Sequence, residues 1–191
     1  MPQVTFALIV ANVIAFVAET AGGDAFIERF ALWPLGPEFA PWQIATYAFL
    51  HGDGTHLFFN MLGLYMFGTP LERVWGPRRH LVYYAVSVLS AGIVQLVVTA
   101  VSGSPYPTIG ASGGVFGMLL AFALFFPQRR VVLLFPPIPM PAWLFATLYG
   151  ALELVLGVTG SQGGVAHFAH LGGMLGGYLL LRQWRSRTGL S

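Results

Sequence analysis

Residues 108–117 read TIGASGGVFG and stand at the start of an apolar run with no charged residue until Arg129. Ser112, which is flanked by glycines, is predicted to lie where a loop becomes a helix. The first N–H groups of a helix have no intrahelical partner, and the helix dipole favours a developing negative charge there. Glycine also lets a second backbone or a substrate approach closely. The stretch alone fits a simpler interpretation as well, because Gly113 and Gly117 have the GxxxG spacing of packed membrane helices.

The composition of the whole chain is that of a membrane protein. Of its 191 residues, 56% are hydrophobic and 8% are charged, whereas soluble domains carry about 25% charged residues. The absence of cysteine excludes disulfides and thiolate metal ligands. No basic segment precedes the first apolar run, which is therefore interpreted as a transmembrane helix and not as a signal peptide.

Six apolar runs are long enough, or nearly so, to cross a bilayer. They cover residues 4–21, 56–71, 80–101, 111–127, 142–158 and 165–182. We therefore predict an all-α membrane protein in which residues 1–191 form a single domain with six transmembrane helices. Prolines interrupt the connector at residues 127–141 and cannot continue a helix.

The basic residues, all of them arginine, predict the orientation of this bundle. Eight of the nine fall after the second, fourth or sixth predicted helix: Arg73, Arg78, Arg79, Arg129, Arg130, Arg182, Arg185 and Arg187. With six spans these three segments share one side, and only Arg29 lies on the other. The positive-inside rule then places both termini in the cytoplasm and the loop at residues 22–55 outside.

In this orientation the second, fourth and sixth helices all begin at the outer face, where their polar residues meet at similar depth. His56 and Asn60 are four residues apart, so they share a helical face and can donate hydrogen bonds to one oxyanion. Ser112 and His170 begin the other two helices, where a hydroxyl and an imidazole can pair as nucleophile and general base. Taken alone, His56 and Asn60 fit a structural role between helices equally well.

Small residues are predicted to bring Ser112 and His170 together. Gly173 and Gly177 follow His170 at i+3 and i+7 and form one stripe on the sixth helix. The fourth helix offers a second stripe, which comprises Gly110, Gly114 and Gly117. We expect the two stripes to pack on each other, as small residues do between membrane helices. Phe116, one turn below Ser112, is expected to hold the imidazole by packing.

No carboxylate is predicted to orient His170. Glu153 is the acid within the fifth helix, in its outer half and nearer the loop that follows. The sequence therefore predicts a two-residue Ser112–His170 dyad. His167, at the mouth of the sixth helix, is assigned a structural role.

Together these motifs resemble those of the rhomboid family of intramembrane serine proteases over nearly the whole chain. The family's Gly-x-Ser-Gly in the fourth helix is matched by residues 110–113, and its His-x-x-x-Asn in the second by His56 and Asn60. Its sixth-helix histidine with small residues is matched by His170, Gly173 and Gly177. Weaker likenesses lie at residues 42–51, Gly68, Glu72 and Gly76. The family often has Trp-Arg in the first loop where this chain has Trp42-Gln43, and the effect of Gln43 is left open.

The resemblance implies hydrolysis of a peptide bond in or beside the transmembrane segment of a single-span protein, near the outer face. Ser112 would form an acyl-enzyme, His170 would accept and return its proton, and the oxyanion would be held by His56, Asn60 and the Ser112 N–H. Gly110, Gly113, Gly173 and Gly177 would support this site. The resemblance also implies that neither a metal nor a cofactor is needed.

The same resemblance implies a minimal six-helix form of the kind common in bacteria, embedded in the cell membrane with its active site on the extracytoplasmic side. The fifth helix and the loop at residues 159–164 would form its gate. The expected partners are substrate helices and the lipid bilayer, with no nucleic acid. The substrate and the oligomeric state are not predicted by the sequence.

Two alternatives stay open. In a metal-binding transporter, His51, His56, His167 and His170 would converge on zinc or another divalent ion. That interpretation leaves the Gly-x-Ser-Gly unexplained, and the His-Glu-x-x-His of zinc proteases is absent. In a catalytically inactive rhomboid relative that binds client helices, the serine or the histidine is typically lost, whereas both are present here.

Overall fold

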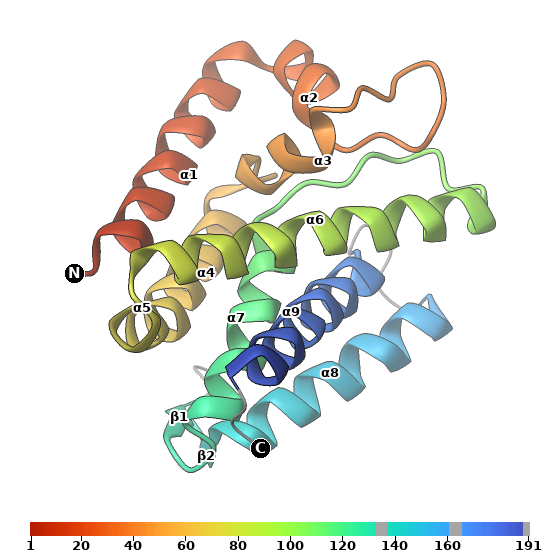
Figure 1. Ribbon diagram of the computed structural model, residues 1–191. Helices are drawn as coiled ribbons and strands as arrows, with labels where there is room; N and C mark the ends of the chain where they lie inside the picture. Colours follow the sequence, from red (N-terminus) through yellow and green to blue (C-terminus); the bar gives the residue numbers. More distant parts are fainter. Residues whose placement is uncertain (133–136, 161–165, 189–191) are drawn as a thin grey trace.

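The structure is a computed structural model that describes residues 1–132, 137–160 and 166–188 (Figure 1). It is mostly helical, and a helix lies at each of the six ranges where the sequence predicts one. The single helices are α1 (Gln3–Gly22), α6 (Pro77–Ser102), α7 (Ser112–Phe125), α8 (Ala142–Thr159) and α9 (His167–Thr188). The second range holds a continuous helical segment, in which α4 (Gly54–Gly63), a π-helical turn η2 (Leu64–Gly68) and α5 (Thr69–Trp75) follow one another.

Two connections differ from the prediction. The proline-rich connector after α7 contains an antiparallel pair of strands, β1 (Arg130–Val132) and β2 (Pro139–Pro141), so the described chain is not purely α-helical. The long first loop contains short helices, which are α2 (Asp24–Phe30), α3 (Gln43–Thr46) and η1 (Tyr47–Phe49). Prolines prevent a helix in the first case, and pairing of the flanking residues satisfies the backbone instead.

The side chain of Gln43 seats the first loop. It is 1% exposed, and its Oε1 accepts from the backbone N–H groups of Trp33 at 3.3 Å and Ala40 at 3.1 Å. Its Nε2 donates to the carbonyl of Glu38 at 3.0 Å. An amide can accept and donate in this way, so Gln43 satisfies buried backbone groups on both sides of the turn.

Helix α7 lies at the centre of the bundle, with α6, α8 and α9 around it (Figure 1). Among the residues that the structure describes, three helices, α1, α6 and α8, are long and apolar enough to cross a membrane. The 14 residues of α7 span only about 21 Å at 1.5 Å per residue, which is less than the roughly 30 Å of a hydrocarbon core. Helix α7 ends beside β1 at one end of the bundle (Figure 1), and Ser112 is the residue at its other end.

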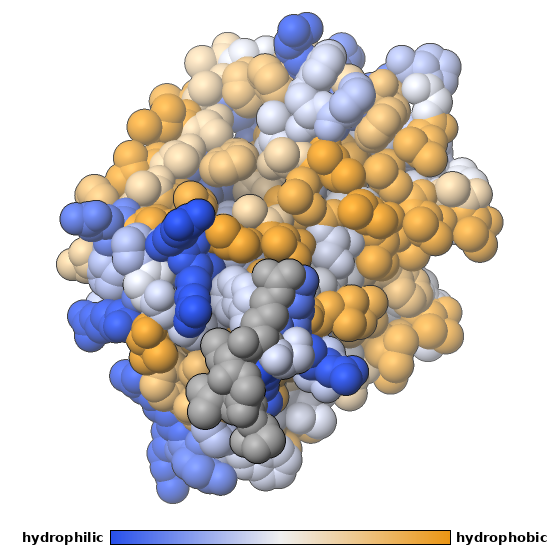
Figure 2. Space-filling model, in the orientation of Figure 1, coloured by the Kyte–Doolittle hydropathy of each residue, from blue (hydrophilic) through white to orange (hydrophobic). Residues whose placement is uncertain are grey.

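The surface divides into an apolar belt and a charged end. Figure 2 shows apolar residues spread over α1 and α6, and hydrophilic residues gathered at the left and lower left. That end holds the start of α1, the α5–α6 junction, β1 and the end of α9 (Figure 1). Its exposed arginines among the described side chains are Arg73, Arg78, Arg79, Arg129, Arg130, Arg182 and Arg185. Exposed side chains of the belt include Phe6, Ile14, Val17, Ile93, Val97 and Val155.

A buried carboxylate fastens the start of α1 to α5. Glu72 Oε1 accepts from the N–H of Val4 at 2.8 Å, and Oε2 accepts from the N–H and the hydroxyl of Thr5, each at 2.7 Å. His80 Nε2 lies 4.0 Å from the same Oε2. A negative charge at a helix N-terminus satisfies its free N–H groups and interacts favourably with the dipole.

Candidate active site

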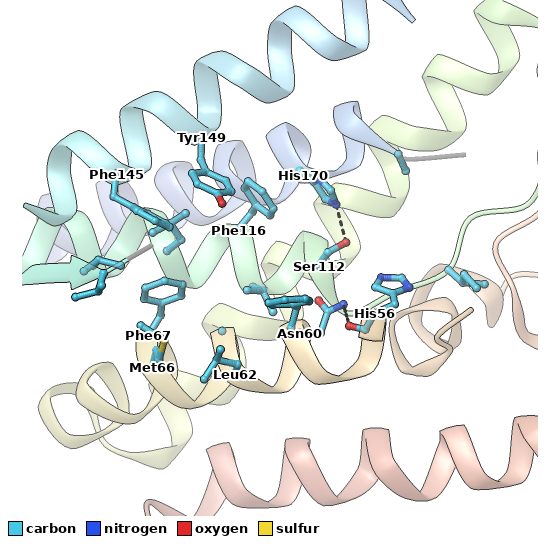
Figure 3. Close-up of a pocket in the computed structure, with 18 of the residues that line it drawn as sticks. His56, Asn60, Leu62, Met66, Phe67, Ser112, Phe116, Phe145, Tyr149 and His170 are labelled. Atoms are coloured by element: carbon cyan, nitrogen blue, oxygen red, sulfur yellow. Dashed lines mark hydrogen bonds between the residues drawn. The ribbon is translucent and has the colours of Figure 1, made fainter. Parts of the chain in front are cut away.

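Ser112 and His170 are in hydrogen-bond contact. Ser112 is the first residue of α7, and His170 lies in the first turn of α9. The Oγ of Ser112 lies 2.7 Å from Nε2 of His170 (Figure 3). The start of α7 has no side-chain cap, so the N–H groups of its first turn stay available to a ligand.

Glycines bring α7 and α9 this close, although not as the sequence predicts. A Cβ on Gly173 would collide with the backbone carbonyl of Gly113. One glycine of the stripe expected on the fourth helix, Gly117, does approach α9. A Cβ added to Gly117 would lie 3.1 Å from the carbonyl oxygen of Gly173. The nearest neighbours of the other glycines belong to different elements: Gly110 with His56, Gly113 with Ala91, Gly114 with Tyr84, and Gly177 with Tyr83. Gly113 also approaches the carbonyl of Ala169 in α9, at 3.6 Å from its Cβ.

The prediction that two glycine stripes face each other is therefore wrong, apart from Gly117. Helix α6 packs against both α7 and α9 (Figure 1), so glycines on both of those helices also accommodate side chains of α6. Close approach of three helices, rather than two, positions the serine against the histidine.

Phe116 supports the imidazole of His170. Their rings are stacked, with centroids 4.3 Å apart and an angle of 4° between the planes. Phe116 lies one helical turn below Ser112, so it covers one face of the imidazole while Nε2 contacts the hydroxyl. The ring of His170 is 8% exposed, and its orientation is held from more than one side.

His56 and Asn60 lie at the same end of the site (Figure 3). Asp53 caps α4, because its Oδ1 accepts from the N–H of His56 at 2.8 Å. This hydrogen bond lowers the pKa of the exposed Asp53 carboxyl below its ordinary value. The Nδ2 of Asn60 donates to the carbonyl of His56 at 3.0 Å, so the amide is bonded within its own helix in this structure.

Gly110 fits the loop against His56. Its φ of 124° lies in the region that favours glycine, and its N–H donates to the carbonyl of Tyr47 at 2.9 Å. A Cβ at this position would lie 2.9 Å from Cε1 and Nε2 of His56 and 3.6 Å from the Oγ of Ser112. The imidazole of His56 and the serine hydroxyl thus flank the same glycine.

These side chains line a cavity of about 640 Å³ between α4–η2, α7 and α8. Four of its polar residues, His56, Asn60, Ser112 and His170, lie together at one end (Figure 3). The remainder of the lining is mostly apolar and includes Leu62, Met66, Phe67, Val115, Leu119 and Phe145. The cavity thus offers an apolar pocket beside a serine hydroxyl, an imidazole and further polar groups.

A carboxylate lies directly behind His170, and the prediction that none is placed there is wrong. Glu153 Oε2 lies 2.6 Å from Nδ1 of His167 and 2.9 Å from Nδ1 of His170. Neighbouring helices α8 and α9 run in opposite directions (Figure 1), and Glu153 faces α9 at the depth of its first turn. Position along the sequence determines that depth but does not show which face of α8 the side chain occupies.

The same three residues are the group that could hold a metal ion among the described ranges. One ligand atom from each of Glu153, His167 and His170 lies within 4.8 Å of the others. The histidines of the first loop form a separate pair, with the ring centroids of His51 and His56 5.0 Å apart. Most of the gate expected at residues 159–164 lies outside the described residues.

Comparison with known proteins identifies the family to which the chain belongs. Residues 38–185 match the family described as Rhomboid domain. The chain is 31% identical over 159 residues to Rhomboid protein 1, mitochondrial, of Saccharomyces cerevisiae, a match that covers 81% of this chain and 45% of that protein. It is 32% identical over 137 residues to Rhomboid protease GluP of Bacillus subtilis, covering 72% and 25% respectively. For Rhomboid protease AarA of Providencia stuartii the identity is 29% over 156 residues, with 73% and 54% covered. The chain thus spans less than half the length of the first two relatives.

Proposed function

The chain belongs to the rhomboid family, and on this basis we propose that it is an intramembrane serine protease with Ser112 as nucleophile and His170 as general base. Three of its relatives are named as proteases. The observation that carries the proposal is the 2.7 Å contact between Ser112 Oγ and His170 Nε2 beside the cavity. A serine hydroxyl is a weak nucleophile unless a base takes its proton as it attacks.

The chemistry is a two-step acyl transfer. Ser112 Oγ attacks the scissile carbonyl carbon, and its proton passes to Nε2 of His170. Collapse of the tetrahedral intermediate breaks the C–N bond, and the leaving amine takes that proton. In the second step, His170 accepts a proton from a water molecule whose oxygen attacks the acyl carbon. The C–Oγ bond then breaks, Ser112 Oγ takes the proton from His170, and the carboxyl product is released.

The oxyanion would form at the start of α7. The N–H of Ser112 lies at the positive end of the helix dipole, where negative charge is stabilised. His56 lies across Gly110 from Ser112 and can donate from its ring. Asn60 can donate as well if its amide turns from the carbonyl of His56, to which it is bonded in this structure.

The substrates proposed are single-span membrane proteins whose cleaved segment leaves the helical conformation. A peptide must be extended to present a carbonyl to Ser112, and the apolar part of the cavity suits an apolar side chain of that peptide. We propose six transmembrane helices in one domain, with both termini in the cytoplasm of a bacterium and the site toward the outer face. The arginines at the end of the bundle opposite α2 and α3 support this orientation.

The proposal is tested by labelling the detergent-purified protein with a fluorophosphonate probe and mapping the modified residue by mass spectrometry. We expect label on Ser112, with none on the Ser112→Ala or His170→Ala variants. Ser104→Ala, which changes a serine in the loop before α7, is the matched control and should label normally. Persistent labelling of Ser112→Ala, or an unlabelled but folded wild-type protein, would contradict the assignment.

A further inference from the structure

Glu153 is a buried acid in the middle of an apolar helix. Its side chain is 10% exposed, and α8 is, among the described helices, one of those long and apolar enough to cross a membrane. An ionised carboxylate is costly in such surroundings unless charges or hydrogen-bond donors compensate it. Here the compensation comes from the Nδ1 atoms of two histidines, and both contact the same oxygen.

The two histidines meet this oxygen in different ways. His167 Nδ1 is hydrogen-bonded to Glu153 Oε2 at 2.6 Å. His170 Nδ1 lies 2.9 Å from the same oxygen, but its angle falls outside hydrogen-bond geometry, and it has no other partner among the described residues. A small rotation of the carboxylate or the ring would align this contact.

The position of Glu153 selects the tautomer of His170 that a general base requires. A carboxylate oxygen beside Nδ1 favours the proton on Nδ1, which leaves the lone pair of Nε2 directed at the hydroxyl of Ser112. When Nε2 accepts the serine proton, the imidazolium carries a positive charge next to the carboxylate. Because both side chains are only 10% exposed, that charge pair is stronger than it would be at a surface.

We propose that Glu153 is a positioning residue that acts through His170 and extends the Ser112–His170 pair to a triad. The inference rests on the proposed function, since it concerns the base of the same reaction. His167 is hydrogen-bonded to the same Oε2, and the inference gives it no part in the reaction. The opposite interpretation is that Glu153 only ties α8 to α9 through His167.

The test uses the rate and affinity of fluorophosphonate labelling, which need no known substrate. In this reaction the Oγ–P bond forms, the P–F bond breaks with loss of fluoride, and the serine proton passes to His170 Nε2. The maximal rate (kinact) reports the activation of Ser112, whereas the half-saturating concentration (KI) reports how well the cavity binds the probe. If Glu153 only ties α8 to α9, a substitution of Glu153 that leaves the fold intact should not change kinact alone.

The variants are Glu153→Gln, which removes the charge at constant shape, Glu153→Asp, which retracts the charge, and His167→Gln as the matched control. We expect kinact of Glu153→Gln to fall by about 10²–10⁴-fold, the upper figure being that of the corresponding change in a serine protease triad, with KI unchanged. The kinact of Glu153→Asp should lie between that of Glu153→Gln and that of wild type. Labelling of His167→Gln should change little.

Several results would overturn the inference while leaving the proposed function standing, provided that wild-type Ser112 labels. One is an unchanged kinact in folded Glu153→Gln or, should that variant not fold, in Glu153→Asp. A second is an equal loss in His167→Gln with no further loss in the double variant, because Glu153 would then act only through His167. A third is a stoichiometric metal ion in the purified wild type whose removal by a chelator changes labelling, because Nδ1 of His170 would then be a metal ligand.

Discussion

Glu72 and Glu153 are two buried carboxylates that lie beside histidine rings, at opposite ends of the described bundle. Glu72 accepts three hydrogen bonds from the first residues of α1, and its histidine, His80, stands 4.0 Å away. Glu153 meets two histidine ring nitrogens at 2.6 and 2.9 Å, and one of those rings contacts a serine hydroxyl. The first carboxylate is satisfied by backbone at a helix end, whereas the second is compensated by groups that can themselves gain or lose protons.

The difference shows that burial of a carboxylate and a histidine does not by itself indicate catalysis. Ser112 and His170 line the cavity, and Glu72 and His80 are not among its described lining residues. A substrate carbonyl can therefore reach the serine beside one pair, while the other pair holds two helix ends together. The two regions therefore differ mainly in that the Glu153 region adjoins a cavity and a serine hydroxyl. The carboxylates alone do not distinguish them.

The largest expected effect comes from replacing one histidine in each region, His170 or His80, with asparagine, which cannot act as a base. His170→Asn should lower the labelling rate of Ser112 by about 10⁴-fold or more, as the loss of the general base does in other serine proteases. His80→Asn should label at the wild-type rate per folded molecule, because His80 lies away from the cavity. Similar losses in both variants would remove the distinction between the regions.

The next largest effect is expected from a substitution of Glu72, which should change stability but not activity. Glu72→Gln weakens the charged hydrogen bonds to Val4 and Thr5 and should lower the free energy of unfolding by about 2–3 kcal/mol, since bonds to charged groups contribute about 1.5–3 kcal/mol each. Labelling of the remaining folded protein should be normal. Thermal melts in detergent, recorded beside the labelling rate, check this. A variant that melts like wild type but labels slowly would reverse the roles of Glu72 and Glu153.

The active-site region also depends on contacts that the Glu72 region does not need. A Cβ on Gly173 would collide with the carbonyl of Gly113, so Gly173→Ala should destabilise the fold by about 1–3 kcal/mol, as overpacked cores are. It should also slow labelling, because α7 and α9 move apart. Gly150→Ala is the matched control on α8, since its nearest atoms lie at an ordinary 3.7 Å. Equal melting temperatures for the two variants would show that the helix contact is looser than the structure has it.

Much of this arrangement follows from the sequence, and the missing part has one physical cause. The helical ranges and the approximate depth of Ser112, His56 and His170 come from run length and position. The rotation of a helix about its axis cannot be read from the sequence in this way. Lipid is as apolar as a protein core, so a transmembrane helix has no polar face that shows which side points away from the bundle. The partners of Glu153 and of the glycines depend on that rotation. This explains why the contact of Glu153 with His170 and the contacts with α6 were not predicted.

The smallest expected effect concerns a third carboxylate, Asp53, which caps a helix as Glu72 does but in contact with water. The hydrogen bond from the N–H of His56 lowers the pKa of Asp53 below 3.8 in the folded protein. Its contribution to stability is therefore complete above the ordinary pKa and is lost as the pH falls through the lower, folded value. Asp53→Asn keeps a good cap without a titrating group, so the melting temperatures of variant and wild type should converge as the pH is lowered through this range. A constant difference would mean that the charge of Asp53 does not stabilise the start of α4, and that the helix end carrying His56 is held by packing alone.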